Sequence, residues 1–383
     1  MLAFISIVVW GGRLPSQQPT CTLQHCIPKT MNKIPTSSAT SLESTAALRR
    51  LFGWLESNYG GLLFDPPRLI STTPLELKAQ HLLDLMSHRA TALHIKKFYP
   101  KSAAVALGKK LAEEAHTNRR NWKISTSRGL ESSDVSTLGE HPPFNIATAM
   151  GKEQEYFQGV TQELYKRRFE MNSVPKDDDD SSSPLPTLWP LDLLRLNLDE
   201  AWPQGAGLAR SQDGHPFSAG LPRIMEGPSR WKKGLIHVDE MGPLDPKQGL
   251  FSANIYLQMP DQEETVLDEP KVKNSISNST NDKEPPSPLQ DTIHIWPLGI
   301  RSRWDWYRNA LSLSGLSSQD AADQMRLWSV LGEPVTVQCE PGDLVLLCVQ
   351  RPHCAVGFEK GTRISLQCFI QHNGADQTLK IDT

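Results

Sequence analysis

The second half of the chain consists of short apolar segments separated by Gly- and Pro-containing turns, and this pattern limits the folds open to it. Each segment has the length of a β-strand. Many short strands on one continuous stretch indicate an antiparallel sandwich or barrel. The segments are residues 221–226, 234–239, 250–259, 292–298, 334–339, 343–349 and 363–370.

The residues before this stretch show helical patterns instead. Within residues 41–59, apolar side chains recur at helical spacing, at Leu48, Leu51, Phe52 and Leu55. Similar patterns predict further helices over residues 74–88, 102–116, 150–169 and 191–201. The sequence therefore predicts an α+β protein in which N-terminal helices support a β core.

Two polar segments divide the chain. Within residues 172–187, four consecutive aspartates are followed by three serines and two prolines, which predicts a solvated acidic loop. Residues 261–290 form a polar, Pro-containing insert, which predicts a disordered loop between two strands. The predicted organisation is a tail over residues 1–42, a helical support region over residues 43–171, the acidic loop, and the core over residues 188–383.

The N-terminal tail leaves the cellular compartment open. The first acidic residue is Glu43, and the segment before it is rich in Ser and Thr, as in organelle transit peptides. A plain disordered tail fits the same composition. The six cysteines form no CxxC pair and no disulfide framework, which favours a reducing compartment. We therefore expect a cytoplasmic protein, with import into a plastid or mitochondrion as the alternative.

Charge and hydropathy argue against two classes of partner. The net charge of −3 is made of interspersed charges, so we expect no nucleic acid partner. No apolar run approaches the roughly 20 residues that a membrane helix requires, so we expect no membrane insertion. A small-molecule substrate remains the expected partner, and the oligomeric state stays open.

Three candidate metal ligands lie in the β half of the chain. His237 and Asp239 are two residues apart in a predicted strand, so their side chains project to the same side. His353 follows the apolar strand at residues 343–349. Two imidazoles and one carboxylate leave three coordination positions open on Fe(II). The HxD pair alone is a weak signal, because an exposed His and Asp on a strand are common.

A second set of polar residues accompanies these ligands. Arg363 and Ser365 share one face of a predicted strand and would offer a carboxylate a fixed cation and a hydroxyl donor. Asn254 and Tyr256 share the polar face of the strand at residues 250–259 and are candidates to bind a co-substrate. A hydrated sheet face explains these two residues equally well.

Together, His237-x-Asp239, His353 and Arg363-x-Ser365 resemble the pattern of the Fe(II)/2-oxoglutarate-dependent dioxygenase superfamily. The resemblance covers roughly residues 220–371 and implies a double-stranded β-helix (jelly-roll) catalytic core with N-terminal supporting helices. It implies that the two histidines and Asp239 bind Fe(II). It also implies that Arg363, helped by Ser365, binds the distal carboxylate of 2-oxoglutarate.

The reaction that the resemblance implies consumes O2 and 2-oxoglutarate and releases succinate and CO2. An unactivated C–H bond of a small molecule, an amino acid or a natural product, would be hydroxylated. Relatives that halogenate have Gly or Ala in place of the acidic ligand, so the intact Asp239 favours hydroxylation or a related oxidation.

The sequence gives weaker evidence for residues that contact the substrate than for the metal ligands. Trp296, Arg303 and Arg351 are candidates to hold an anionic small molecule against an aromatic wall. An amphipathic helix packed on the core explains the cluster at residues 301–307 more simply. Three other functions stay open: a peptide or protein hydroxylase, a non-catalytic jelly-roll binding protein, and a hydrolytic zinc enzyme, which would leave Arg363 unexplained.

Overall fold

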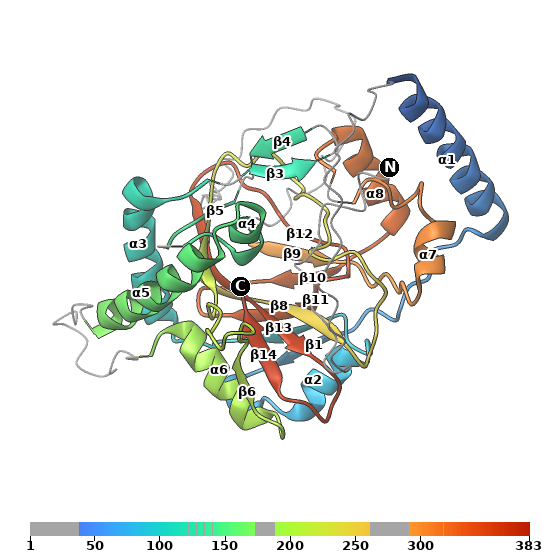
Figure 1. The fold of residues 1–383 in the computed structure, drawn as a ribbon. Helices are drawn as coiled ribbons and strands as arrows, with labels where there is room; N and C mark the ends of the chain where they lie inside the picture. The colour runs from blue at the N-terminus through green and yellow to red at the C-terminus, as the bar shows by residue number, and fades with distance from the viewer. Residues whose placement is uncertain are drawn as a thin grey trace, which may run out of the picture.

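The computed structural model (Figure 1) describes residues 38–121, 123–126, 129–132, 135–139, 141–172, 188–260, 291–316 and 318–383. The predictions made for residues 1–37, for most of the acidic loop and for the insert at 261–290 lie outside these residues. Within the described part, no helix is both long enough and apolar enough to cross a membrane.

The predicted helices are present, with shifted ends. The segment at 74–88 is divided into a short 3-10 turn and a helix, because Leu77 and Lys78 between them are extended. The main helices of the N-terminal half are α1 (Ser38–Tyr59), α2 (Ala79–Met86), α3 (Lys101–Asn118), α4 (Phe144–Ala149), α5 (Glu153–Asn172) and α6 (Pro190–Ala201). Two more helices, α7 (Arg303–Arg308) and α8 (Ala321–Leu331), lie within the β half.

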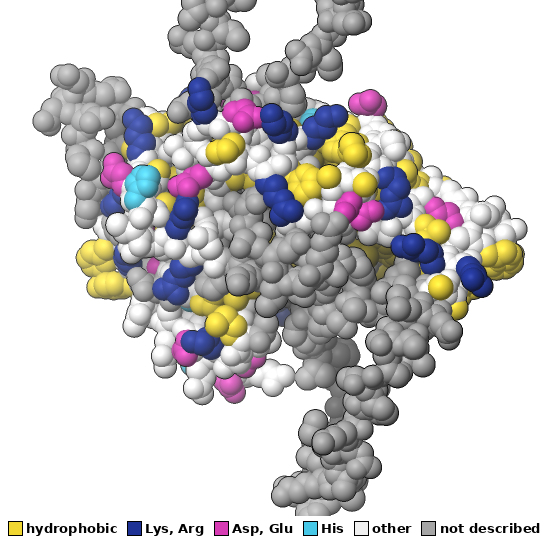
Figure 2. Space-filling view, turned by 90° about the horizontal axis from the view of Figure 1, so that it is seen from above, with side chains coloured by type: hydrophobic (Ala, Val, Ile, Leu, Met, Phe, Trp, Pro, Cys, Tyr) yellow, Lys and Arg dark blue, Asp and Glu magenta, His cyan; other side chains and the backbone are white. Residues whose placement is uncertain are grey.

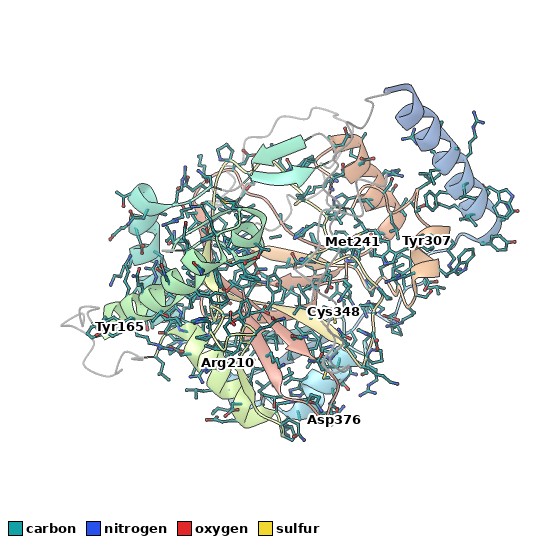
Figure 3. The ribbon with its side chains drawn as sticks, viewed as in Figure 1. Tyr165, Arg210, Met241, Tyr307, Cys348 and Asp376 are labelled. Atoms are coloured by element: carbon teal, nitrogen blue, oxygen red, sulfur yellow. The ribbon has the colours of Figure 1, made fainter. Side chains whose placement is uncertain are left out.

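Helix α1 projects from one end of the molecule beside α7 (Figures 1 and 3). Tyr307 of α7 faces α1, and its ring stacks on Phe52 with 6.4 Å between the ring centroids. Glu56 of α1 accepts hydrogen bonds from the backbone N–H groups of Leu311 and Ser312. The helix predicted at 41–59 is therefore held by the segment that follows α7.

A large sheet of nine strands runs through the described residues, and most of its pairings are antiparallel. Its central order is β2-β11-β8-β13, and β7 and β14 both pair with β13 on the side away from β8. Strands β1, β2 and β5 come from the region predicted to be helical support. The strands are β1 (Leu69–Thr72), β2 (Ala92–Ile95), β5 (Ser136–Thr137), β6 (Ala206–Leu208), β7 (Leu221–Glu226), β8 (Gly249–Gln258), β11 (Leu344–Cys348), β13 (Thr362–His372) and β14 (Leu379–Asp382).

A small sheet of three strands lies over one face of the large sheet (Figure 1). Its order is β10 (Val335–Gln338), β9 (Thr292–Ile295) and β12 (His353–Ala355). The segment predicted as a strand at 234–239 joins β12 through one bridge only, between His237 and His353. This prediction of a full strand is wrong, because the segment makes a turn at Gly234 and bends again at Asp239.

The two faces of the large sheet contact different partners. On one face, Phe251, Ala253, Ile255 and Leu257 of β8 pack into the main hydrophobic core with apolar side chains of α2, α3 and α6. On the other face, Tyr256, Val345 and Leu347 pack against Ile293, Ile295 and Val337 of the small sheet. The protein is therefore a mixed α and β structure with a large, mostly antiparallel sheet covered on both faces.

Two short strands, β3 (Lys123–Thr126) and β4 (Gly129–Ser132), form a separate hairpin. On the face of the molecule shown in Figure 2, Lys and Arg side chains are interspersed with acidic and hydrophobic ones. This face therefore presents no large field of a single sign.

Candidate metal centre

His237, Asp239 and His353 come together at the edge of the small sheet. One potential ligand atom from each lies within 4.8 Å of the others. The Nε2 atom of His237 is 3.7 Å from Oδ1 of Asp239, and the Nε2 atom of His353 is 3.5 Å from Oδ2. The backbone bridge between the two histidines sets this geometry: each donates its N–H to the other's carbonyl, at 3.0 and 2.9 Å. These are the three metal ligands predicted from the sequence.

Backbone carbonyls orient both imidazole rings. The Nδ1 atom of His237 lies 2.9 Å from the Leu235 carbonyl oxygen, and that of His353 lies 2.9 Å from the Arg351 carbonyl oxygen. A carbonyl can only accept a hydrogen bond, so Nδ1 carries a proton, and in the neutral imidazole the free lone pair is then on Nε2. Both lone pairs are thus on the atoms nearest to Asp239, as in metal-binding histidines.

The protonation state of His353 also suits a metal. Burial lowers the pKa of His353 to about 4, with a further contribution from His237, so this imidazole is neutral at neutral pH. The Oδ2 atom of Asp239 is buried and has no hydrogen-bond partner in the described part of the chain. Such a carboxylate oxygen is costly unless a cation satisfies it. Two imidazoles and one carboxylate in this arrangement fit a divalent transition metal, and the set matches the facial triad of non-heme Fe(II).

Arg363 lies on the central strand β13, with its side chain toward the small sheet. It is 6% exposed, and its Nη2 donates to the Val356 carbonyl oxygen at 2.6 Å. The guanidinium carbon lies 5.0 Å from the ring centroid of Phe358, and burial lowers the pKa of the group. An exposed arginine on an edge strand is therefore excluded, and the structure holds a buried cation in a fixed position.

Ser365, Tyr256 and Asn254 share this face of the large sheet. Ser365 pairs with Tyr256 across β13 and β8, and Gln367 pairs with Asn254. Tyr256 is buried; burial raises its pKa well above the usual value, whereas the nearby Arg363 acts to lower it. Asn254 donates to the Ser252 hydroxyl at 3.1 Å. The four residues predicted to bind a co-substrate thus lie on one covered face.

The three residues predicted to contact the substrate have other partners. Arg351 is 0% exposed; it forms a 2.6 Å ion pair with Asp65 and donates to the Leu298 carbonyl oxygen at 3.0 Å. Trp296 is fully buried and donates to the Gly332 carbonyl oxygen at 2.8 Å. Arg303 is exposed at the start of α7. The Arg351 carbonyl oxygen accepts a hydrogen bond from Nδ1 of His353, but none of the three side chains has a described contact with the triad. Their role in substrate binding therefore stays a prediction.

Sequence reasoning missed one cation on the inner face, Arg223 of β7. This residue lies opposite Ser365 in the sheet. A signal was present, because Leu221, Arg223 and Met225 alternate with Pro222 and Ile224 in the segment predicted as a strand. Arg223 is therefore a second arginine within a mostly apolar strand, as Arg363 is in β13.

No family model matches the chain, and no curated protein matches it. Partial likeness to solved structures exists. An N-substituted L-amino acid dioxygenase from Burkholderia ambifaria is 13% identical over 69% of this chain and 100% of its own, with a TM-score of 0.34.

The non-heme α-ketoglutarate-dependent carbocyclase SnoK from nogalamycin biosynthesis is 13% identical over 82% of this chain and 99% of its own, with a TM-score of 0.37. A hypothetical protein, JW0805 from Escherichia coli, is 10% identical over 86% of this chain and 77% of its own, with a TM-score of 0.36. Likeness at this level is too slight to assign a fold or a function.

Proposed function

We propose that this protein is an Fe(II)- and 2-oxoglutarate-dependent oxygenase that hydroxylates a small molecule. The observation that carries the proposal is the oriented His237, Asp239 and His353 triad on a structure whose inner face also holds the buried Arg363. A zinc site would need the triad but not a buried guanidinium on the same face. A non-catalytic binding protein would need neither.

The path of the chain between the sheets supports a double-stranded β-helix as the fold. After β7 in the large sheet, the chain passes to the His237 segment beside the small sheet and returns to β8. It then forms β9 and β10 in the small sheet, β11 in the large sheet, β12 in the small sheet and β13 in the large sheet. This alternation of antiparallel strands is typical of a jelly roll. In this proposal the catalytic core is the region 188–383, to which β1, β2 and β5 add strands.

The residues have separate roles in this proposal. His237, Asp239 and His353 would hold Fe(II), which supplies the redox chemistry that couples decarboxylation of 2-oxoglutarate to oxidation of a C–H bond with O2. Arg363 would bind the distal carboxylate of 2-oxoglutarate through charge-assisted hydrogen bonds, with Ser365 as a second donor. Tyr256 and Asn254 would line the same face. Burial of Arg363 strengthens its interaction with a carboxylate, because little water competes for it.

The first test is the binding of Fe(II) and 2-oxoglutarate without oxygen. We expect a visible metal-to-ligand charge-transfer band in the wild-type protein. The band should vanish in His237→Ala, and Arg363→Ala should need far more 2-oxoglutarate to develop it. Arg50→Ala, on the exposed surface of α1, is the matched control and should behave as wild type. Folded, metal-loaded wild-type protein without a band would overturn the proposal.

The substrate class is tested next by measuring succinate release. Amino acids and natural products should stimulate turnover of 2-oxoglutarate if a small molecule is the substrate. Stimulation by peptides, with small molecules as weak competitors, would contradict the small-molecule assignment and favour a peptide hydroxylase.

A further inference from the structure

Arg223 points toward the inner face of the large sheet, on the same side as Arg363. In the antiparallel pair of β7 and β13, Arg223 lies opposite Ser365 and Met225 lies opposite Arg363. Residues directly opposite one another in such a pair project to the same face. Two contacts agree with this assignment. The Met225 sulfur is 4.0 Å from Nη1 of Arg363, and Ile224 packs into the core on the other face.

The guanidinium of Arg223 has no hydrogen-bond acceptor and no carboxylate partner among the described residues. Its Nε atom is buried without a hydrogen-bond partner, and none of the ion pairs among the described residues includes Arg223. Burial lowers the pKa of Arg223, and the carboxylate that counteracts this is Asp239 of the candidate metal centre. Arg223 as a whole is half-buried, and a buried N–H donor without an acceptor is costly to keep. This cost is explained if a ligand supplies the anion.

Arg351 shows what a structural buried arginine looks like in this protein. It is fully buried, pairs with Asp65 at 2.6 Å and donates to the Leu298 carbonyl oxygen. Arg223 has neither kind of contact among the described residues, although it lies within the large sheet, on β7 between β5 and β13. Asp239 cannot take the place of Asp65, because its carboxylate belongs to the triad and would bind the metal.

We propose that Arg223 is a second carboxylate-binding residue of the site, separate from Arg363, and that it binds a carboxylate held beside the metal centre. The proposal rests on the proposed function. Two molecules could carry this carboxylate: 2-oxoglutarate, through the end nearer the metal, or the substrate, which would then be an organic acid or amino acid. The planar fork of arginine suits a carboxylate in either case, because it can donate two parallel hydrogen bonds.

The test compares wild type with Arg223→Gln, Arg223→Lys and the exposed control Arg50→Gln. All four proteins are loaded with Fe(II) without oxygen, and 2-oxoglutarate affinity is measured by calorimetry. Straight-chain monocarboxylates of two to eight carbons are then added with and without 2-oxoglutarate, with the corresponding amides as uncharged controls. Thermal unfolding reports whether each compound binds.

Two results would support the proposal and identify the source of the carboxylate. If it belongs to 2-oxoglutarate, the affinity for this acid falls about 10- to 100-fold in Arg223→Gln and less in Arg223→Lys. If it belongs to the substrate, 2-oxoglutarate affinity changes less than about twofold, but monocarboxylates stabilise wild type and not Arg223→Gln. Amides should stabilise neither protein. Without ligand, Arg223→Gln should unfold at or above the wild-type temperature, because no described side-chain hydrogen bond or ion pair is lost.

The proposal is overturned if no carboxylate distinguishes wild type from Arg223→Gln, or if Arg223→Gln unfolds at a clearly lower temperature without ligand. The second result would show a structural arginine. Failure of the proposed function looks different: wild type would then not bind 2-oxoglutarate at all. Stabilisation by monocarboxylates that depends on Arg223 would still establish the anion site in that case.

Discussion

The two faces of strand β13 are both covered by protein, but they differ in chemistry. On the helix side, Ile364, Leu366, Cys368 and Ile370 pack into the main core. On the inner side, the same strand presents Arg363, Ser365 and Gln367, and neighbouring β7 adds Arg223. The helix-side residues are explained by packing alone. Arg363 and Ser365 are polar in spite of burial, and Gln367 and Arg223 are half-buried polar residues beside them. Burial of polar groups costs stability, so these residues indicate binding rather than folding.

The largest effect on folding is expected from the helix side. Leu366 is fully buried in the main core, so Leu366→Ala should lower the free energy of unfolding by about 2–5 kcal/mol. Urea denaturation of the metal-free protein measures the loss. Leu75→Ala, at a residue that is 99% exposed, is the control and should change stability by less than about 0.5 kcal/mol. A similar loss in both variants would contradict the assignment of Leu366 to the core.

For Arg363 on the inner side we expect the reverse: a small effect on stability and a large effect on binding. Arg363→Met removes a buried charge while keeping much of the volume, so the free energy of unfolding without ligand should change by less than about 1 kcal/mol. Binding of 2-oxoglutarate should fall about 100-fold, because about 3 kcal/mol of charge-assisted hydrogen bonding is lost. Paired denaturation and calorimetry separate the two effects. A large loss of stability with unchanged 2-oxoglutarate binding would show that Arg363 serves folding and not binding.

His372, at the end of β13, should make the free energy of unfolding depend on pH. This residue is 1% exposed and its ring stacks on Phe251, and burial lowers its pKa to about 4. The unfolded chain takes up a proton near pH 6.5 but the folded protein does not, so stability is complete above that pH and falls toward pH 4. The slope contributed by His372 is at most about 1.4 kcal/mol per pH unit.

His372→Gln should remove this slope from denaturation curves recorded between pH 4 and 6.5. A residual slope should remain, because burial also lowers the pKa of His88 to about 3. An unchanged slope in His372→Gln would show that this imidazole titrates normally in the folded protein.

The smallest effect on 2-oxoglutarate binding is expected at Ser365. Ser365→Ala removes one hydroxyl from the inner face, so 2-oxoglutarate affinity should fall about fivefold, equivalent to about 1 kcal/mol. Stability without ligand should stay within about 0.5 kcal/mol of wild type. Calorimetry beside the exposed control Ser314→Ala checks both values. Equal affinities in the two variants would remove Ser365 from the co-substrate site.

Much of the fold was predictable because it depends on local patterns. Period-2 alternation in segments such as 250–259 and helical spacing in 41–59 reflect which side chains face the core, so strands and helices followed from them. Strands β1 and β2 were missed because each has four residues, too few for a period to show. They are strands because they pair with one another and β2 pairs with β11.

The candidate site was predicted in part for a similar reason. His237 and Asp239 are neighbours in sequence, and their spacing alone suggests that they project together. Their approach to His353 depends on a single bridge between distant segments, which the spacing does not contain. The substrate contacts predicted at Trp296 and Arg351 rested on residue type, an aromatic ring and a cation, and the structure provides both side chains with other partners.

The sequence by itself determined which residues alternate, many of the segments that form strands and which side chains can bind a metal, because these properties belong to neighbouring residues. Only the tertiary structure decided which polar residues are buried together and which of them have protein partners. Arg351 and Arg223 are chemically identical in the sequence. They differ because the fold brings Asp65 to the first and the candidate metal centre to the second.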